Sequence, residues 1–96
     1  MPGTVRLTDI CTGHGCYPPR DNASGSPNVF ANRLACHRVG DEWKWHGCVV
    51  CEPHGGTQAT GSPNVFVNRK PLARIGDAID CGSLNWTGSR NVITNG

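Results

Sequence analysis

A short motif occurs three times along this chain, and no other feature restricts its fold as strongly. The copies read S-G-S-P-N-V-F-A-N at residues 24–32, T-G-S-P-N-V-F-V-N at 60–68 and T-G-S-R-N-V-I-T-N at 87–95. Their first glycines, Gly25, Gly61 and Gly88, stand 36 and 27 residues apart. Near-identical segments at such spacings indicate one supersecondary unit that is repeated three times.

A second motif, Arg-x-x-Asp, alternates with the first one. It reads R-L-T-D at residues 6–9, R-V-G-D at 38–41 and R-I-G-D at 74–77. The chain therefore enters partway through one unit, and its last segment completes the third. This circular permutation favours three units arranged around a pseudo-threefold axis over an open stack.

The local sequence of each unit predicts short strands and turns. G-S-P-N is typical of a turn, because proline fixes φ and asparagine tolerates the left-handed region. The V-F-x-N that follows alternates as in a short strand. The chain has 13 Gly and 7 Pro among its 96 residues, which argues against long helices. We therefore expect an all-β fold and a single domain over residues 1–96, without an extension domain.

The core that this chain can form is small, which indicates that the fold needs a metal or a covalent cross-link. Only 36% of its residues are hydrophobic, and a domain of this size is often held by a metal or by disulfides. The N-terminus lacks the apolar stretch of a signal peptide, so we expect synthesis in the cytoplasm, where metal binding is favoured over disulfides. The net charge of +2 comes from scattered cations and gives little support to nucleic-acid binding.

The repeat phase brings candidate metal ligands together. His54 and Cys81 each stand seven residues before the first glycine of their own motif, and His14 stands eleven residues before Gly25, with extra length in between. A threefold axis would make these equivalent side chains converge, and His46 from the long second unit supplies a fourth. Three imidazoles and one thiolate in a closed set suit one structural Zn²⁺.

Other histidines and cysteines leave alternatives open. His37 is a competing ligand, although it stands where the next unit has alanine. Cys48 and Cys51 form C-x-x-C, which suits half of a zinc knuckle, a redox pair or a local disulfide. Cys11 and Cys16, spaced C-x₄-C, would complete a four-cysteine site. The alternative function is therefore a small zinc-binding adaptor or redox module that uses Cys48 and Cys51.

An enzymatic role has little support in the residue pattern. A hydrolytic zinc enzyme needs an open metal position and a general base. The only glutamates are Glu42 and Glu52, and neither stands in an H-E-x-x-H pattern. We therefore expect no catalytic residues.

The repeated motifs together resemble a known family, the PAAR-repeat proteins, which are named after proline-alanine-alanine-arginine. The resemblance rests on P-L-A-R-I-G-D at residues 71–77, on the G-S-P-N-V-F copies and on T-G-H-G-C-Y-P-P-R at 12–20. Leucine departs from the motif in the first of these, and the earlier copy, A-C-H-R at 35–38, lacks the proline. The resemblance covers essentially the whole chain.

The resemblance implies a fold, a metal and a partner. Proteins of this family form a small β-rich cone with pseudo-threefold symmetry, and a zinc near the vertex is bound by three histidines and one cysteine. That set agrees with His14, His46, His54 and Cys81. The flat base docks on the blunt end of a trimeric β-helical needle, which is the VgrG-type spike of the type VI secretion system or the central spike of a contractile phage tail.

These features lead to an expected role. We expect a non-enzymatic tip that caps and sharpens the spike for membrane puncture, with one chain per spike trimer and transient contact with the target membrane. The free protein is expected to be a monomer that is delivered with the secretion spike or forms part of a virion tail tip.

Overall fold

Short antiparallel strands and turns make up the whole described fold. The computed structural model describes residues 2–15, 17–48 and 51–94, without the side chains of residues 48 and 51–53. The strands form three hairpins: β1 (Phe30–Ala31) with β2 (Leu34–Ala35), β3 (Glu42–Cys48) with β4 (Cys51–Thr57), and β5 (Phe66–Val67) with β6 (Lys70–Pro71). The described residues contain no helix, which confirms the all-β prediction. In particular, none of them forms a helix long and apolar enough to cross a membrane.

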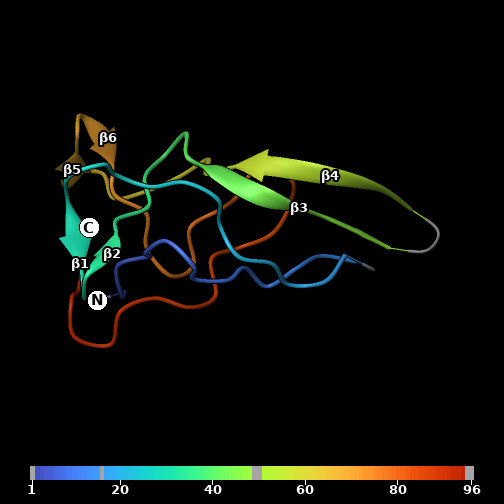
Figure 1. Ribbon diagram of the computed structural model, residues 1–96, viewed down its shortest axis with the longest axis horizontal. Helices are drawn as coiled ribbons and strands as arrows, with labels where there is room; N and C mark the ends of the chain where they lie inside the picture. The colour runs from blue at the N-terminus through green and yellow to red at the C-terminus, as the bar shows by residue number, and fades with distance from the viewer. Residues whose placement is uncertain (1, 16, 49–50, 95–96) are drawn as a thin grey trace.

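The hairpins lie at two ends of an elongated molecule. The principal extents are 38 × 25 × 21 Å. The hairpins β1–β2 and β5–β6 lie together at one end with both termini, and the longer hairpin β3–β4 projects to the other (Figure 1). We call these the hairpin-pair end and the β3–β4 end.

A closed triangle of backbone hydrogen bonds relates the three units. The amide of Val5 donates to the carbonyl of Ala73 (3.0 Å), Ala73 donates to His37 (2.9 Å), and His37 donates to Val5 (3.0 Å). Each residue directly precedes the arginine of one Arg-x-x-Asp motif, and all three are fully buried. The predicted ring of three units around a pseudo-threefold axis is therefore confirmed.

The two ends of the chain complete one unit between them. Gly3 and Ile93 form an antiparallel bridge, and the amide of Thr94 donates to the carbonyl of Pro2 at 3.0 Å. This is the closure that the circular permutation predicts.

The repeated glycines are required by close approach of another backbone segment. A Cβ built at Gly25, Gly61 or Gly88 would lie 2.8–2.9 Å from a carbonyl oxygen. Real Cβ atoms are not found that close to a carbonyl oxygen, so a side chain there would push the segments apart. The equivalent contact in all three units explains why the motif keeps this glycine.

The serine after each glycine organises the turn. The hydroxyls of Ser26, Ser62 and Ser89 each accept hydrogen bonds from the amides two and three residues later, at 2.8–3.3 Å. All three serines are buried. The side chain thus supplies hydrogen bonds that a backbone turn would otherwise need.

The asparagines with a left-handed backbone are not those of the G-S-x-N turns, where the sequence suggested them. The asparagines of the G-S-x-N turns do not have positive φ angles. Positive φ instead occurs at Asn32 and Arg33 (53° and 68°) and at Asn68 and Arg69 (54° and 67°). These pairs form the two-residue turns of β1–β2 and β5–β6, where a type I′ turn matches the strand twist. The serine hydroxyl makes a left-handed residue unnecessary in G-S-x-N.

The hydrophobic core is small and divided in two. One cluster, Ala31, Cys36, Val67 and Leu72, lies between the paired hairpins. The other consists of Cys11, Trp43 and Ile79, with Cys81 packed against it. Most of the remaining buried side chains are polar, so hydrogen bonds and ion pairs occupy much of the interior.

Candidate metal centre

Four side chains from three parts of the chain meet near β3 and β4. They are His14, His46, His54 and Cys81, and their nitrogen and sulfur ligand atoms all lie within 4.8 Å of one another. His46 on β3 and His54 on β4 are partners in the register of the hairpin. His14 lies in the loop that precedes Tyr17, and Cys81 lies in the turn that follows Ile79. The structure therefore brings together all four residues that the sequence selected.

The three imidazoles converge through the same ring nitrogen. The Nε2 atom of His54 lies 3.0 Å from Nε2 of His14 and 2.8 Å from Nε2 of His46. Tetrahedral ligands at the zinc–nitrogen distance of about 2.0–2.1 Å lie roughly 3.3 Å apart. One proton shared between two imidazoles cannot serve three converging nitrogens, whereas a central cation can. The donor set fits a metal ion.

The surroundings favour the neutral imidazoles that bind metals. Burial lowers the pKa of His14, and the nearby charges of His54 and Arg20 lower it further. Burial also lowers the pKa of His46, partly offset by a hydrogen bond to the carbonyl of Pro18. Metal binding requires a deprotonated nitrogen, so these shifts make the site more competent near neutral pH.

Two neighbours orient the histidine rings. The Nδ1 atom of His46 lies 2.8 Å from the carbonyl oxygen of Pro18. A carbonyl only accepts, so Nδ1 carries the proton and Nε2 keeps its lone pair for the centre. The Tyr17 ring lies 4.8, 4.9 and 4.2 Å from the ring centroids of His14, His46 and His54. It packs against all three imidazoles and restricts their rotation.

A buried arginine holds the sulfur side of the centre. Arg20 donates from Nη2 to the Sγ of Cys81 (3.3 Å) and from Nη1 to the Sγ of Cys11 (2.9 Å). Its Nε donates to the carbonyl of Lys44 (2.7 Å), and its guanidinium lies 5.3 Å from the Trp43 ring centroid. Burial alone would raise the pKa of Cys11, but the hydrogen bonds and charge of Arg20 lower it. The same guanidinium thus contacts the sulfur atoms of both cysteines and fixes the position of the Cys81 side chain beside the three imidazoles.

The competing ligand His37 and the cysteine that precedes it are both absent from the group. His37 lies outside the group, because it is fully buried with Nδ1 2.9 Å from the carbonyl oxygen of Ser24 and its ring against Trp43. Cys36 belongs to the other core cluster, where burial raises its pKa.

The four-cysteine alternative depends on residues that the structure does not describe. Cys16 and the side chains of Cys48 and Cys51 lie outside the described part of the chain. Their backbones place Cys48 and Cys51 opposite each other at the end of the β3–β4 hairpin. The redox or zinc-knuckle interpretation therefore stays a prediction.

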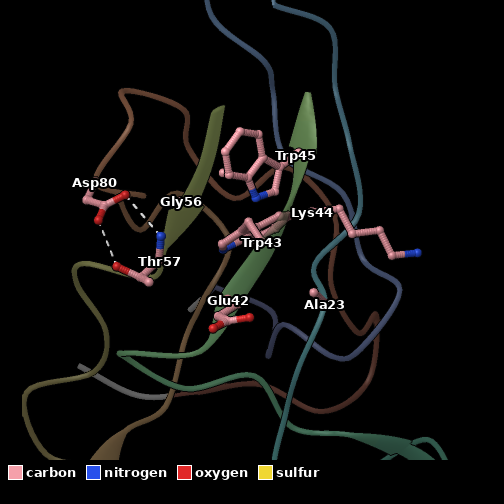
Figure 2. A pocket seen from close by; sticks show the side chains of 9 residues that line it. Ala23, Glu42, Trp43, Lys44, Trp45, Gly56, Thr57 and Asp80 are labelled. Atoms are coloured by element: carbon pink, nitrogen blue, oxygen red, sulfur yellow. Dashed lines mark hydrogen bonds between the residues drawn. The ribbon is translucent and has the colours of Figure 1, made fainter. Parts of the chain in front are cut away.

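The candidate ligands do not line the larger described hollow. A hollow of about 580 Å³ lies beside β3 and β4, with Glu42, Trp45 and Asp80 among its lining residues (Figure 2). The backbone amide and hydroxyl of Thr57 both donate to the Asp80 carboxylate there. The His/Cys group is therefore distinct from this hollow, although Gly55 and Asp80 of its lining adjoin His54 and Cys81 in the sequence.

Sequence reasoning missed the residues that support the ligands. Arg20, Pro18 and Tyr17 all belong to Y-P-P-R, which the repeat comparison treated as extra length. That insertion was itself the available signal, because it has no counterpart in the other units and adjoins a candidate ligand.

Comparison with known proteins agrees with the repeat pattern. The family model described as the PAAR motif matches residues 12–84. No curated protein matches the sequence at a significant level. The matched region contains the four candidate ligands and two of the three Arg-x-x-Asp motifs. Because the match spans well over half of the 96 residues, the chain belongs to the family of PAAR-motif proteins.

Proposed function

We propose that this protein is the non-enzymatic tip of a contractile injection machine and that it caps the end of a trimeric spike. Membership of the PAAR-motif family implies a spike-tip role in type VI secretion or in phage tails. The observation that carries the finer proposal is the ring of three units closed by the triangle of Val5, His37 and Ala73. A single chain with this symmetry can present three similar surfaces to three identical subunits.

An exposed apolar triad supplies the proposed docking contact. Phe30, Phe66 and Ile93 occupy the same position in the three repeats and are 58%, 56% and 45% exposed. Repeat-equivalent residues encircle the pseudo-threefold axis, so these side chains form one apolar set at the hairpin-pair end. Exposed apolar side chains grouped in this way mark interaction surfaces. One chain per spike trimer follows from the symmetry.

The proposed metal stiffens the opposite end. We assign one structural Zn²⁺ to His14, His46, His54 and Cys81, which would tie together three segments that share little apolar core. When bound, the ion supplies folding free energy, on the order of 10 kcal/mol for structural zinc in small domains. Compression during puncture loads this end, and a cross-linked site resists it.

The same donor set argues against hydrolytic chemistry. Four protein ligands complete a tetrahedral zinc and leave no position for water or substrate. No specific observation favours the adaptor or redox alternative. We further propose synthesis in the cytoplasm and delivery with the spike, or incorporation at the tip of a virion tail.

The stoichiometry with a spike tests the proposal. The purified zinc-loaded chain is mixed with a trimeric VgrG-type spike protein, and the complex is weighed by light scattering. We expect one chain per trimer. The double variant Phe30→Ser/Phe66→Ser should lose binding, whereas Trp45→Ser, which alters an exposed side chain on β3, should retain it. Three chains per trimer, or equal binding by the double variant, would contradict the proposal.

A further inference from the structure

The ionic side chains of this protein are divided unevenly along its long axis. Three arginines are neutralised within the fold, because Arg6–Asp9, Arg38–Asp41 and Arg74–Asp77 form ion pairs of 2.8–2.9 Å. The remaining cations are Arg20, Arg33, Lys44, Arg69, Lys70 and Arg90, and the remaining acids are Asp21, Glu42, Glu52 and Asp80.

Four of these cations lie at the hairpin-pair end. Arg33 is in the β1–β2 turn, Arg69 is in the β5–β6 turn, Lys70 begins β6, and Arg90 stands in the third repeat where the other two have proline. All four are exposed, and none forms an ion pair with another described residue. The segments that build this end, residues 24–39, 60–75 and 87–94, contain no Asp or Glu.

All four remaining acids belong to or adjoin β3–β4. Glu42 and Glu52 are strand residues, Asp21 pairs with Lys44 of β3 at 2.8 Å, and Asp80 accepts two hydrogen bonds from Thr57 of β4 (Figure 2). The cations at this end are Arg20 and Lys44. The hairpin-pair end therefore carries four positive charges without an ion-pair partner among the described residues. The β3–β4 end carries four acids and two cations, which is an excess of two negative charges.

The basic residues belong to the same segments as the apolar triad, and the hairpin turns dock on neighbouring repeats. Asn32 donates to the side chain of Asn91 (2.8 Å), and Asn68 donates to that of Asn28 (2.9 Å). Each turn thus lies against the G-S-x-N turn of another unit, which sets the turn cations beside it. A hollow of about 280 Å³ between Asn32 and Arg90 marks one such junction.

We infer that the hairpin-pair end docks on a trimeric protein end whose apolar centre is bordered by Asp or Glu side chains. The inference rests on the proposed function and adds the chemistry of the partner. An apolar centre with a charged border is the usual anatomy of a protein interface. Clustered cations without acids speed encounter with an acidic surface, and the opposite charge of the β3–β4 end orients the approach.

The threefold arrangement favours a trimeric protein over other anionic partners. Anionic lipid and nucleic acid also attract cations, but neither requires three equivalent apolar side chains around one axis. A trimer of identical subunits presents three equivalent apolar surfaces, which is what Phe30, Phe66 and Ile93 match.

Association kinetics at two salt concentrations test the inference. The proteins are the zinc-loaded chain, a quadruple variant Arg33→Gln/Arg69→Gln/Lys70→Gln/Arg90→Gln, and the control Lys44→Gln at the other end. Glutamine keeps an unbranched polar side chain without the charge and adds no new strain at the two turn positions. The partner is a trimeric VgrG-type spike, together with a spike variant whose border carboxylates are changed to amides. Rates are measured by stopped flow at roughly 20 and 300 mM salt, because screening is weak at the first concentration and strong at the second.

We expect the wild-type association rate to fall at least about tenfold between the two salts. The quadruple variant, and the wild type with the amide spike, should associate slowly at both salts, while Lys44→Gln follows the wild type. Equal rates for the quadruple variant would overturn the inference, and the proposed function would still stand if Phe30→Ser/Phe66→Ser abolished binding. Failure of the wild type to bind any spike would overturn both. Tighter cation-dependent binding to phosphatidylglycerol vesicles than to the spike would assign the surface to lipid instead.

Discussion

The hydrophobic core of this protein is too small to stabilise the fold alone, and the two ends of the molecule are stabilised in different ways. At the hairpin-pair end the serine-capped turns and the glycine contacts occur in three repeat-equivalent copies, and the Arg–Asp pairs of the three units are repeated in the same way. At the β3–β4 end the contacts occur once, around His14, His46, His54 and Cys81. Repetition spreads stability over many weak contacts, whereas the candidate metal centre concentrates it in one.

This difference has a consequence for mutation. Losing one of several equivalent contacts at the hairpin-pair end should cost part of the stability. Losing one ligand at the β3–β4 end should remove the whole contribution of the metal. The following variants test that contrast, in order of expected effect.

The largest effect is expected for a lost ligand. His54→Ala should abolish tight zinc binding and lower the free energy of unfolding by several kcal/mol, because bound structural zinc contributes on the order of 10 kcal/mol. The buried His37 gives a matched control. His37→Ala should lose packing against Trp43 but keep one zinc per chain. Elemental analysis and thermal melting measure both; full zinc occupancy in His54→Ala would show that the ligand set is wrong.

A smaller loss is expected for one buried ion pair of the repeated kind. In Asp41→Asn, Arg38 loses a charged partner whose side chain is only 6% exposed, which should cost about 3 kcal/mol. The control Asp21→Asn breaks the solvent-exposed pair with Lys44 and should cost at most about 0.5 kcal/mol. Urea unfolding of the zinc-loaded proteins measures the difference.

The pH dependence of the Asp41 effect has a definite sign. Burial alone would raise the pKa of Asp41, but the hydrogen bonds and charge of Arg38 bring it below its ordinary value. The stabilisation is therefore complete above the pKa of an unfolded aspartate and is lost as the pH falls through the lower folded value. The gap between wild type and Asp41→Asn should be constant from pH 7 to pH 5 and shrink only in stronger acid. A gap that shrinks near pH 6 would assign the effect to the histidines instead.

A smaller effect than the loss of an ion pair is expected for Arg20, which donates to the sulfur ligand. Arg20→Met replaces the guanidinium over the Trp43 ring with an uncharged side chain and removes the donor to Cys81. Residues that support metal ligands typically contribute 10–100-fold in affinity, so zinc affinity should fall by about that factor. Lys44→Met removes an exposed cation nearby and should change it little. Competition with a chelating dye measures both affinities, and unchanged affinity in Arg20→Met would show that Arg20 only packs.

The contrast between the two ends also explains what the sequence could predict. Repetition is visible in a single sequence, so G-S-x-N-V and Arg-x-x-Asp led to the ring of units, and the phase of His54 and Cys81 led to the candidate ligands. Contacts that occur once leave no such pattern. Arg20 reaches Cys81 over 61 positions of chain, and Pro18 orients His46 through a backbone carbonyl, which no residue type encodes.

The smallest effect concerns a place where the three repeats differ. The residue before each Asp of Arg-x-x-Asp has a positive φ: 91° at Gly40, 91° at Gly76 and 81° at Thr8. A β-branched residue in that region is strained by about 1–3 kcal/mol. The exposed Thr8 side chain offers little packing in return. The Thr8 amide donates to the side chain of Asn22, and a glycine at this position has the same backbone donor.

Thr8→Gly should therefore stabilise the protein by about 1 kcal/mol, since glycine relieves the strain but adds roughly 0.4–1 kcal/mol of entropy to the unfolded chain. The reciprocal variant Gly76→Ala should destabilise by about 1–2 kcal/mol. No atom lies within 4 Å of a Cβ built at Gly76, so the cost is one of backbone conformation alone. Both free energies come from urea unfolding at saturating zinc. A loss of stability in Thr8→Gly would mean that the first unit, which adjoins the loop carrying His14, depends on its threonine side chain and is not equivalent to the other two.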